Sequence, residues 1–242
     1  MRVAVISDIH GNLHALETVL AAIDDERPDA LWCLGDLVGY GPRPNECTAR
    51  VAERANVCLV GNHDLGVIGR ISLDEFSHDA AAAAEWTQSV LGEPQLAYLK
   101  SLDSTAEVEG AELYHASPRD PVWDYILTAD GAIDALRRTT APLVLVGHSH
   151  VALGVGLEDG RLDGGLAPAG TEVDLSTGRW LINPGSVGQP RDGDPRAAYL
   201  MVDFERMFAG FRRVEYPVEQ TQAEIRELGL PATLAERLAH GQ

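Results

Sequence analysis

Short runs of apolar residues alternate with helical patterns through the first sixty residues of the chain. Three runs are apolar along nearly their whole length and are predicted as strands: Arg2–Asp8, Ala30–Asp36 and Asn56–Gly61. Apolar residues three and four positions apart predict helices over Asn12–Asp24, with Asn12 as N-cap, and over Asn45–Arg54. Strands that are apolar throughout and separated by helices indicate a parallel sheet covered on both faces.

A helical insertion follows this alternation. Between Leu65 and Leu102 no strand pattern appears, and helices are predicted over Asp79–Leu91 and Pro94–Lys100. We interpret residues 65–102 as a cap-like insertion within a single domain that spans residues 1–242.

The second half of the chain is rich in strand patterns. The strands predicted there are Thr105–Glu109, Glu112–His115, Leu143–Gly147, Ala197–Phe204 and Gly210–Tyr216. Asp159-Gly160 and Thr177-Gly178 are typical of hairpin turns, and Gly164–Gly170 is predicted as a loop. Helical patterns over Val218–Leu228 and Ala232–His240 complete the chain, so we expect an α/β fold.

The composition allows a large core and argues against several classes of partner. Hydrophobic residues make up 45% of the 242 positions, and 37 acidic residues against 19 basic ones give a net charge of −18. Such a surface repels long nucleic acids and anionic membranes, whose binding depends on lysine and arginine. No apolar run approaches the ~20 residues of a membrane span, and we find no signal-peptide pattern.

The cysteines indicate a reducing compartment. Cys33, Cys47 and Cys58 are odd in number and lack the C-x-x-C spacing of redox and zinc motifs. We therefore expect buried thiols and a cytoplasmic protein.

Five short segments place metal-binding side chains directly after apolar runs. They are Asp8-Ile9-His10, Gly35-Asp36, Gly61-Asn62-His63-Asp64, His115 and Gly147-His148-Ser149-His150. Active sites of α/β sheets lie at the carboxyl ends of strands, so these segments are expected to converge at one edge. Residues two apart in an extended segment point to the same side, so Asp8 and His10 can bind one ion, and His148 and His150 repeat that spacing.

The mixture of side chains narrows the choice of metal. Asp36 supplies a carboxylate that can bridge two cations, and Asn62 offers a neutral amide oxygen. Carboxylate, imidazole and amide ligands suit Mn²⁺, Fe or Zn²⁺ and argue against a thiolate-rich structural zinc site. Two such cations about 3.5–4 Å apart can polarise a phosphoryl group and lower the pKa of a bound water.

In their order along the chain, these motifs resemble the motif set of the calcineurin-like metallophosphoesterases. They span residues 7 to 150, and Asn183-Pro184-Gly185-Ser186 is similar to the late loop of the small bacterial subgroup that includes YfcE-like phosphodiesterases. The resemblance implies a four-layer αββα sandwich of the metallophosphoesterase type. It also implies a dinuclear centre with two divalent ions, Mn²⁺ in the first place and Fe, Zn²⁺, Ni²⁺ or Mg²⁺ as alternatives.

The same resemblance assigns roles to individual residues. The implied ligands are Asp8, His10 and His150 for the first metal, Asn62, His115 and His148 for the second, and Asp36 as the bridge. His63 would be the general acid or would stabilise the transition state, with Asp64 as the carboxylate that orients it. A hydroxide that bridges the two metals would be the nucleophile.

The substrate implied is a small phosphate ester or nucleotide-like molecule, and a phosphodiester is favoured. The predicted substrate-binding residues are Asn12, Tyr40, Arg43 and Arg119, while Trp123, Arg191 and Arg196 also flank the motifs. Neither a long nucleic acid nor a membrane is expected as a partner, and a homo-oligomer is compatible with the sequence.

Several alternatives remain open at this point. A Ser/Thr protein phosphatase or a phosphomonoesterase would share the fold, although Asp36 lacks the Asp-Arg-Gly that usually follows in protein phosphatases. Gly147-His148-Ser149-His150-Val151 nearly matches the G-x-S-x-G motif of serine hydrolases, but Val151 replaces the last glycine. A scaffold protein that kept the fold and lost catalysis, as in the retromer subunit that resembles these enzymes, is the third alternative.

Overall fold

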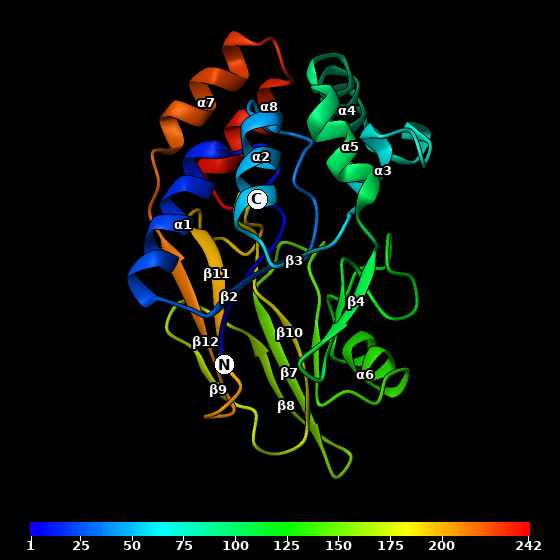
Figure 1. Cartoon of the computed structure of the whole chain (residues 1–242), viewed down its shortest axis with the longest axis vertical. Coiled ribbons are helices and arrows are strands. Elements are labelled where there is room, and N and C mark those ends of the chain that lie inside the picture. Colours follow the sequence, from blue (N-terminus) through cyan, green and yellow to red (C-terminus); the bar gives the residue numbers. More distant parts are fainter.

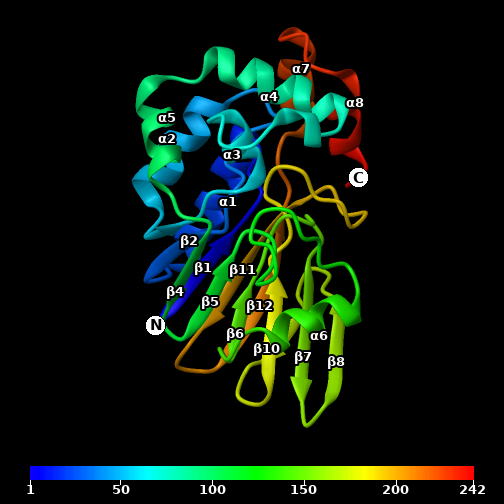
Figure 2. The ribbon, with the colours of Figure 1, turned by 90° about the vertical axis from the view of Figure 1, so that its right-hand side faces the viewer.

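Two six-stranded mixed sheets pack face to face in the computed structural model, which describes residues 1–242 (Figure 1, Figure 2). The first sheet, in spatial order, contains β3 (Val57–Cys58), β2 (Ala30–Cys33), β1 (Arg2–Ile6), β11 (Ala197–Asp203), β12 (Phe208–Val214) and β9 (Glu172–Asp174). The second contains β4 (Thr105–Val108), β5 (Ala111–Tyr114), β6 (Leu143–Leu145), β10 (Arg179–Asn183), β7 (Leu153–Glu158) and β8 (Arg161–Leu166).

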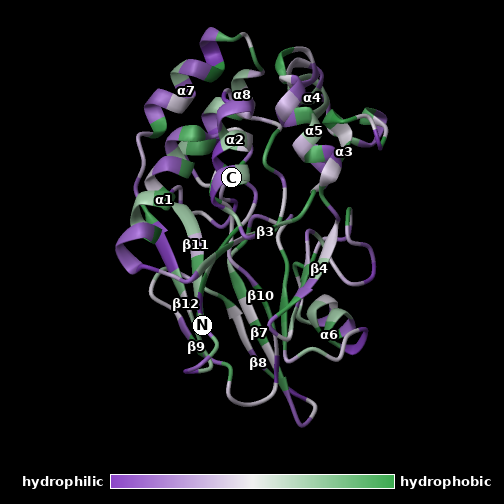
Figure 3. Ribbon diagram, viewed as in Figure 1, coloured by the Kyte–Doolittle hydropathy of each residue, from purple (hydrophilic) through white to green (hydrophobic).

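Helices lie outside the two sheets, and most of them gather at one end of the molecule (Figure 2). They are α1 (Leu13–Glu26), α2 (Pro44–Arg54), α3 (Asn62–Val67), α4 (His78–Val90), α5 (Glu93–Ser101), α6 (Ala129–Arg137), α7 (Val218–Glu227) and α8 (Ala232–Glu236), with short 3-10 helices η1 (Leu73–Glu75) and η2 (Arg237–Ala239). In Figure 3 the outer helix α7 is mostly hydrophilic in colour, whereas α1 alternates between hydrophilic and hydrophobic positions, as a helix with one buried face should.

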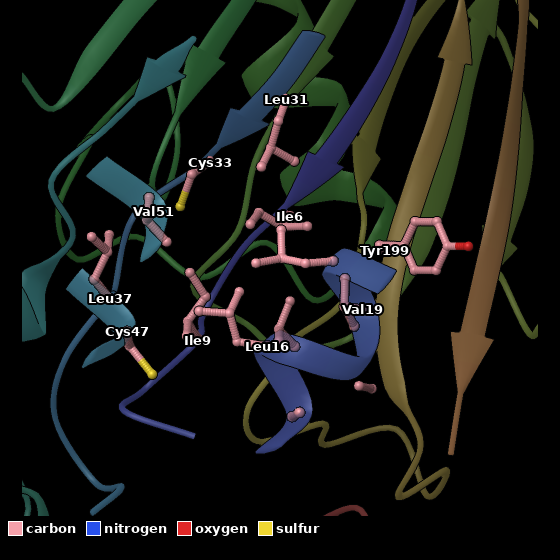
Figure 4. Close-up of a cluster of buried hydrophobic side chains, with 14 of the residues drawn as sticks. Ile6, Ile9, Leu16, Val19, Leu31, Cys33, Leu37, Cys47, Val51 and Tyr199 are labelled. Carbon is pink, nitrogen blue, oxygen red and sulfur yellow. The ribbon is translucent and has the colours of Figure 1, made fainter. Parts of the chain in front are cut away.

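Three apolar clusters join the four layers. The first lies between the first sheet and its helices, where Ile6 and Leu31 meet Leu16 and Val19 of α1 (Figure 4). The second lies between the two sheets and contains the fully buried Trp32. The third packs the buried face of α6 onto the second sheet. The predicted αββα sandwich is confirmed by this layering.

Parallel pairing aligns the carboxyl ends of the strands that precede the candidate ligands. Ile6 of β1 is paired with Cys33 of β2, and Cys33 is paired with Cys58 of β3. In the second sheet, β5, β6 and β10 also run parallel. The strand-end segments of both sheets consequently face the same region of the molecule.

The predicted boundaries hold for most elements, and three predictions differ from the structure. The Thr177-Gly178 turn does not form a hairpin, because β9 pairs with β12 in the first sheet and β10 pairs with β7 in the second. Gly164 and Gly165 belong to strand β8 and not to a loop, and helix α6 was not predicted. The Asp159-Gly160 hairpin is confirmed by the pairing of β7 with β8.

The segment from Leu65 to Leu102 contains η1, α4 and α5 and no strand. None of the helices is both long and apolar enough to cross a membrane.

Candidate metal centre

The strand ends of both sheets bring all seven predicted ligand residues together. Two groups of side chains could each hold an ion, and their ligand atoms lie within 4.8 Å of one another inside each group. One group is Asp8, His10, Asp36 and His150, and the other is Asp36, His115 and His148. Asn62 joins the second group, since its Oδ1 lies 3.2 Å from Nε2 of His115. Asp36 is shared by both groups, as a bridging ligand would be.

The backbone at these positions is held in an uncommon conformation. Five of the candidate ligands have positive φ, between 50° and 62°: Asp8, His10, Asp36, His148 and His150. Residues other than glycine rarely adopt this region, and each such residue costs of the order of 1–3 kcal/mol unless its surroundings enforce it. Such strain concentrates at functional sites, and here it turns successive side chains toward one point.

Two glycines allow the strand ends to approach closely. A Cβ atom on Gly61 would lie 2.1 Å from Oδ1 of Asp36, and one on Gly147 would lie 2.1 Å from Oγ of Ser7. Both contacts are far shorter than real Cβ atoms permit, so these positions require glycine.

Backbone carbonyls fix the orientation of three imidazole rings. Nδ1 of His10 donates to the Val38 carbonyl oxygen at 3.0 Å, and Nδ1 of His150 donates to the Gln189 carbonyl oxygen at 2.7 Å. His115 makes the same contact with the Leu34 carbonyl oxygen at 2.9 Å. A carbonyl oxygen only accepts, so each Nδ1 carries a proton and each ring turns its Nε2 toward the site. In the neutral rings of His10 and His150 this Nε2 presents a lone pair.

These lone pairs meet inside the site. Nε2 of His10 lies 3.0 Å from Nε2 of His150. Burial lowers the pKa of both rings well below the usual value, so both are neutral and two lone pairs face each other. That arrangement is repulsive until a cation lies between or beside the two nitrogens.

Buried polar atoms without hydrogen bonds also indicate that these side chains suit a metal ion. Oδ2 of Asp36 and Nε2 of His148 are buried and form no hydrogen bond. Leaving buried polar groups unpaired costs about 1–3 kcal/mol each, and more for a carboxylate. Carboxylate, imidazole and amide donors of this kind match divalent transition ions, so the residues present fit a metal.

The charges of the site favour a cation in the same place. Burial opposes a charge on His115, yet the carboxylates of Asp36 and Asp8 outweigh it and raise the pKa of the ring to about 9. Burial raises the pKa of Asp8 to about 7, while His115 acts in the opposite direction. The field that holds a proton on His115 is the field that would hold a divalent cation.

His63 lies beside the ligand cluster in a mostly aromatic environment. Its ring centroid is 4.8 Å from that of His10, 4.4 Å from that of Tyr40 and 5.0 Å from that of Phe76. The backbone N–H of His63 donates to Oδ1 of Asp36 at 2.9 Å, which ties the start of α3 to the cluster. Burial lowers the pKa of His63 to about 4, so the ring is neutral at neutral pH.

The predicted contact between Asp64 and His63 is wrong. Oδ1 of Asp64 accepts the backbone N–H groups of Leu37 and Val38 at 2.9 and 3.1 Å, and Oδ2 accepts that of Gly61 at 3.0 Å. Nδ1 of His63 is buried without a hydrogen-bond partner. The carboxyl group of Asp64 therefore fastens the loop after Asp36 to the start of α3 and does not orient the imidazole.

We expect Asp64→Ala to lower stability more than chemistry. Three buried N–H groups would lose their acceptor, which corresponds to about 3 kcal/mol of unfolding free energy and a fall of roughly 6–12 °C in melting temperature. Differential scanning calorimetry measures this change, with Asp134→Ala on the exposed face of α6 as a control that should melt close to wild type. An unchanged melting temperature for Asp64→Ala would contradict the proposed role.

Of the four predicted substrate-binding residues, only Tyr40 lies against the cluster, with its ring centroid 4.7 Å from that of His10. Asn12 is buried and caps α1, and its side chain also bonds Gly188 and Thr221. Both Nε and Nη2 of Arg43 donate to Glu224 at 2.9 Å.

The second predicted arginine is also paired: the exposed Arg119 forms an ion pair with Asp124. Because these polar groups are already satisfied, the structure argues against Asn12, Arg43 and Arg119 as direct substrate contacts. The serine-hydrolase alternative also fails, since the buried Ser149 accepts from Nδ2 of Asn183 and has no histidine partner.

Three residues near the cluster were not singled out from the sequence. The ring of Tyr125 stacks on that of His148 at 4.0 Å, Gln189 orients His150, and Phe76 brings the segment after α3 against His63. All three lie in loops outside the motifs, so only the tertiary structure reveals them.

The fold and the candidate metal centre are those of the calcineurin-like phosphoesterase class. Residues 1–207 match the calcineurin-like phosphoesterase superfamily domain. The chain therefore belongs to the calcineurin-like phosphoesterase superfamily, and the predicted family is confirmed.

Two similar proteins match along the whole chain. The chain is 40% identical over 245 residues to the uncharacterized protein MJ0912 of Methanocaldococcus jannaschii, covering 99% of this chain and 98% of that protein. A crystal structure of a metallophosphoesterase from Sphaerobacter thermophilus is 44% identical, covers 100% of this chain and 99% of its own, and superposes with a TM-score of 0.90.

A more distant similarity covers part of the chain. A symmetrical bis(5'-nucleosyl)-tetraphosphatase of Vibrio cholerae is 32% identical over 127 residues, which are 50% of this chain and 45% of that enzyme.

Proposed function

We propose that this protein is a metal-dependent hydrolase of phosphate esters, with a phosphodiester as the favoured substrate and two metal ions at the site. The observation that carries the proposal is the pair of ligand groups that share Asp36, whose buried Oδ2 forms no hydrogen bond. We assign Asp8, His10 and His150 to one ion, Asn62, His115 and His148 to the other, and Asp36 to both. Mn²⁺ is our first choice, because mixed carboxylate, imidazole and amide donors suit it.

When bound, the two ions would supply Lewis-acid stabilisation of a phosphoryl group and an activated water. The chain contributes the remaining parts. The backbone carbonyls behind three histidines hold the ligand rings in one orientation and fix their protonation, which prepares the site before substrate arrives. We assign to His63, which is neutral and anchored through its own N–H to Asp36, the donation of a hydrogen bond to an oxygen of the phosphoryl group.

The surroundings support a small substrate with an aromatic group. Tyr40 lies against His63, Tyr125 stacks on His148, and the ring of Trp123 lies 5.2 Å from that of Phe76. Aromatic rings around a phosphate-binding site can stack on a nucleobase. The similarity to an enzyme named for bis(5'-nucleosyl) tetraphosphates supports a nucleotide-like substrate. Three free cysteines, two of them buried, agree with a cytoplasmic location.

The proposal predicts metal-dependent turnover of bis(p-nitrophenyl) phosphate. Protein treated with a chelator should be inactive, and Mn²⁺ should restore hydrolysis. The metal should also raise the melting temperature, because a ligand present at 100 times its dissociation constant adds about 2.7 kcal/mol to stability. Release of p-nitrophenol and a thermal-shift titration measure the two effects. Absence of turnover with Mn²⁺, Fe²⁺, Zn²⁺, Ni²⁺ and Mg²⁺, on diesters and monoesters alike, would favour a scaffold function.

A further inference from the structure

Two arginines beside the candidate metal centre converge on one neutral acceptor. Nη2 of Arg191 donates to Oε1 of Gln189 at 2.8 Å, and Nη1 of Arg237 donates to the same oxygen at 3.2 Å. Neither guanidinium has a carboxylate oxygen within 4.0 Å. The chain has 37 acidic residues, so a pair of partly buried arginines without an acidic partner is unexpected on electrostatic grounds.

The arginine pair is linked to the candidate metal ligands through Gln189 and Tyr40. The carbonyl oxygen of Gln189 accepts from Nδ1 of His150, while the side chain of the same glutamine holds both guanidinium groups. Nη2 of Arg191 also donates to the Tyr40 hydroxyl at 3.3 Å, and the Tyr40 ring lies against His10 and His63. The arginine pair is therefore connected to the ligand cluster by two routes, and each route passes through a single residue, Gln189 or Tyr40.

The last helices of the chain bring Arg237 to this position. Ile225, Leu234 and Leu238 form an apolar cluster with Ala83 of α4, and the ring of Tyr40 packs against it. Figure 2 shows α7, α8 and the C-terminus at the same end of the molecule as α4. Arg237 lies beyond residues 1–207, which match the family domain, whereas Arg191 lies within them.

The two positive charges repel each other, and neither forms an ion pair with a carboxylate. Burial lowers the pKa of Arg237, and Arg191 lowers it further. The carboxyl group that acts on Arg237 from nearby is Asp79, which accepts the Thr233 hydroxyl. Each guanidinium carries five N–H donors; Arg191 uses three of them on Gln189 and Tyr40, and Arg237 uses one on Gln189, so two donors of Arg191 and four of Arg237 remain free. A tetrahedral oxyanion would satisfy the free donors and relieve the repulsion.

We propose that Arg191 and Arg237 form an anion subsite that binds a second phosphate group, linked to the phosphate held at the metal ligands. This inference rests on the proposed function and narrows it to substrates with at least two phosphates joined by an anhydride bond, such as nucleoside polyphosphates. Arginine suits this role because its planar fork binds two phosphate oxygens at once. The single-phosphate esters used as general substrates would leave the subsite unfilled.

The first test needs no metal and no turnover. Isothermal titration calorimetry on chelator-treated protein should show binding of inorganic pyrophosphate, and Arg237→Met should weaken it at least about tenfold. Arg237→Lys keeps the positive charge but loses the planar guanidinium, so its affinity for pyrophosphate should lie between those of wild type and Arg237→Met. Arg138→Met, which removes an exposed arginine of α6 paired with Asp134, is the matched control and should bind like wild type. No binding by wild type, or equal binding by wild type and Arg237→Met, overturns the subsite.

The second test separates this inference from the proposed function. With Mn²⁺ bound, Arg237→Met should raise KM for a dinucleoside tetraphosphate at least about tenfold more than KM for bis(p-nitrophenyl) phosphate. Equal changes for the two substrates contradict the subsite while the phosphoesterase proposal stands. If wild type turns over neither substrate, the proposed function fails, and the calorimetric comparison still decides whether the arginines bind pyrophosphate.

Discussion

Replacing Asp36 with asparagine is expected to lower kcat/KM for bis(p-nitrophenyl) phosphate by at least ~10³-fold, because metal ions contribute several kcal/mol of transition-state stabilisation. The side chain is shared by both ligand groups, and its Oδ2 forms no hydrogen bond. Asparagine retains an oxygen that can accept the backbone N–H of His63, so the local fold should persist. It loses the charge and the second ligand oxygen, so the metal content should fall as well.

Elemental analysis and steady-state kinetics on the same preparations measure both losses. Asp130→Asn at the exposed start of α6 removes an equal charge far from the cluster and should match wild type. A variant of Asp36 that keeps its full metal content and more than a tenth of the activity would show that the two groups do not share a bridging carboxylate.

The sequence was sufficient to predict the meeting of the ligand segments, because parallel strands force that result. Asp8 follows β1 and Asp36 follows β2, and pairing of the two strands brings their ends together. The backbone N–H of Asp8 donates to the carbonyl oxygen of Gly35 at 3.0 Å, directly before the second aspartate. A pattern of strands followed by polar residues is thus enough to predict where the site lies, without any knowledge of side-chain conformation.

The backbone conformation of the candidate ligand residues could not be predicted from the sequence. Positive φ at Asp8, His10 and three further ligand positions is imposed by the surrounding loops, and the local residue types do not indicate it. The misassigned Thr177-Gly178 turn has a related cause. Its residues specify that the chain reverses, but the partner of each neighbouring strand is chosen by the packing of two sheets.

Helix α6 shows the opposite case, in which a local signal was present. Thr128 caps the helix by accepting the N–H of Gly131, and Ala132, Ala135 and Leu136 form its buried face. The glycine in the first turn weakens the helical pattern, since glycine disfavours helices by about 1 kcal/mol relative to alanine.

The residues predicted to bind substrate lie mostly away from the ligand cluster, because nearness in sequence is a poor guide to nearness in space. Arg43 follows the Asp36 segment closely, yet Glu224 of α7 pairs with it. Arg237 belongs to the last helical turn and shares an acceptor with Arg191. Only the packing of α7 and α8 against α4 brings it there.

His63→Ala is expected to lower kcat by ~10²–10⁴-fold while both metals remain bound, since this is the usual contribution of a positioned proton-donating group. Burial lowers the pKa of His63 to about 4, and nearby cations would lower it further, so the ring donates a hydrogen bond from its neutral form. His63→Gln, which retains an N–H donor of similar length, should therefore recover part of the loss.

The pH profile of kcat tests the protonation state of His63. Because a group with a lowered pKa is already neutral between pH 6 and 8, titration of His63 should produce no step in the wild-type rate over that range, and the profiles of wild type and His63→Gln should have the same shape there. Such a step, measured in pH profiles of kcat, would instead identify His63 as a charged general acid, and full activity of His63→Ala would remove it from the mechanism altogether.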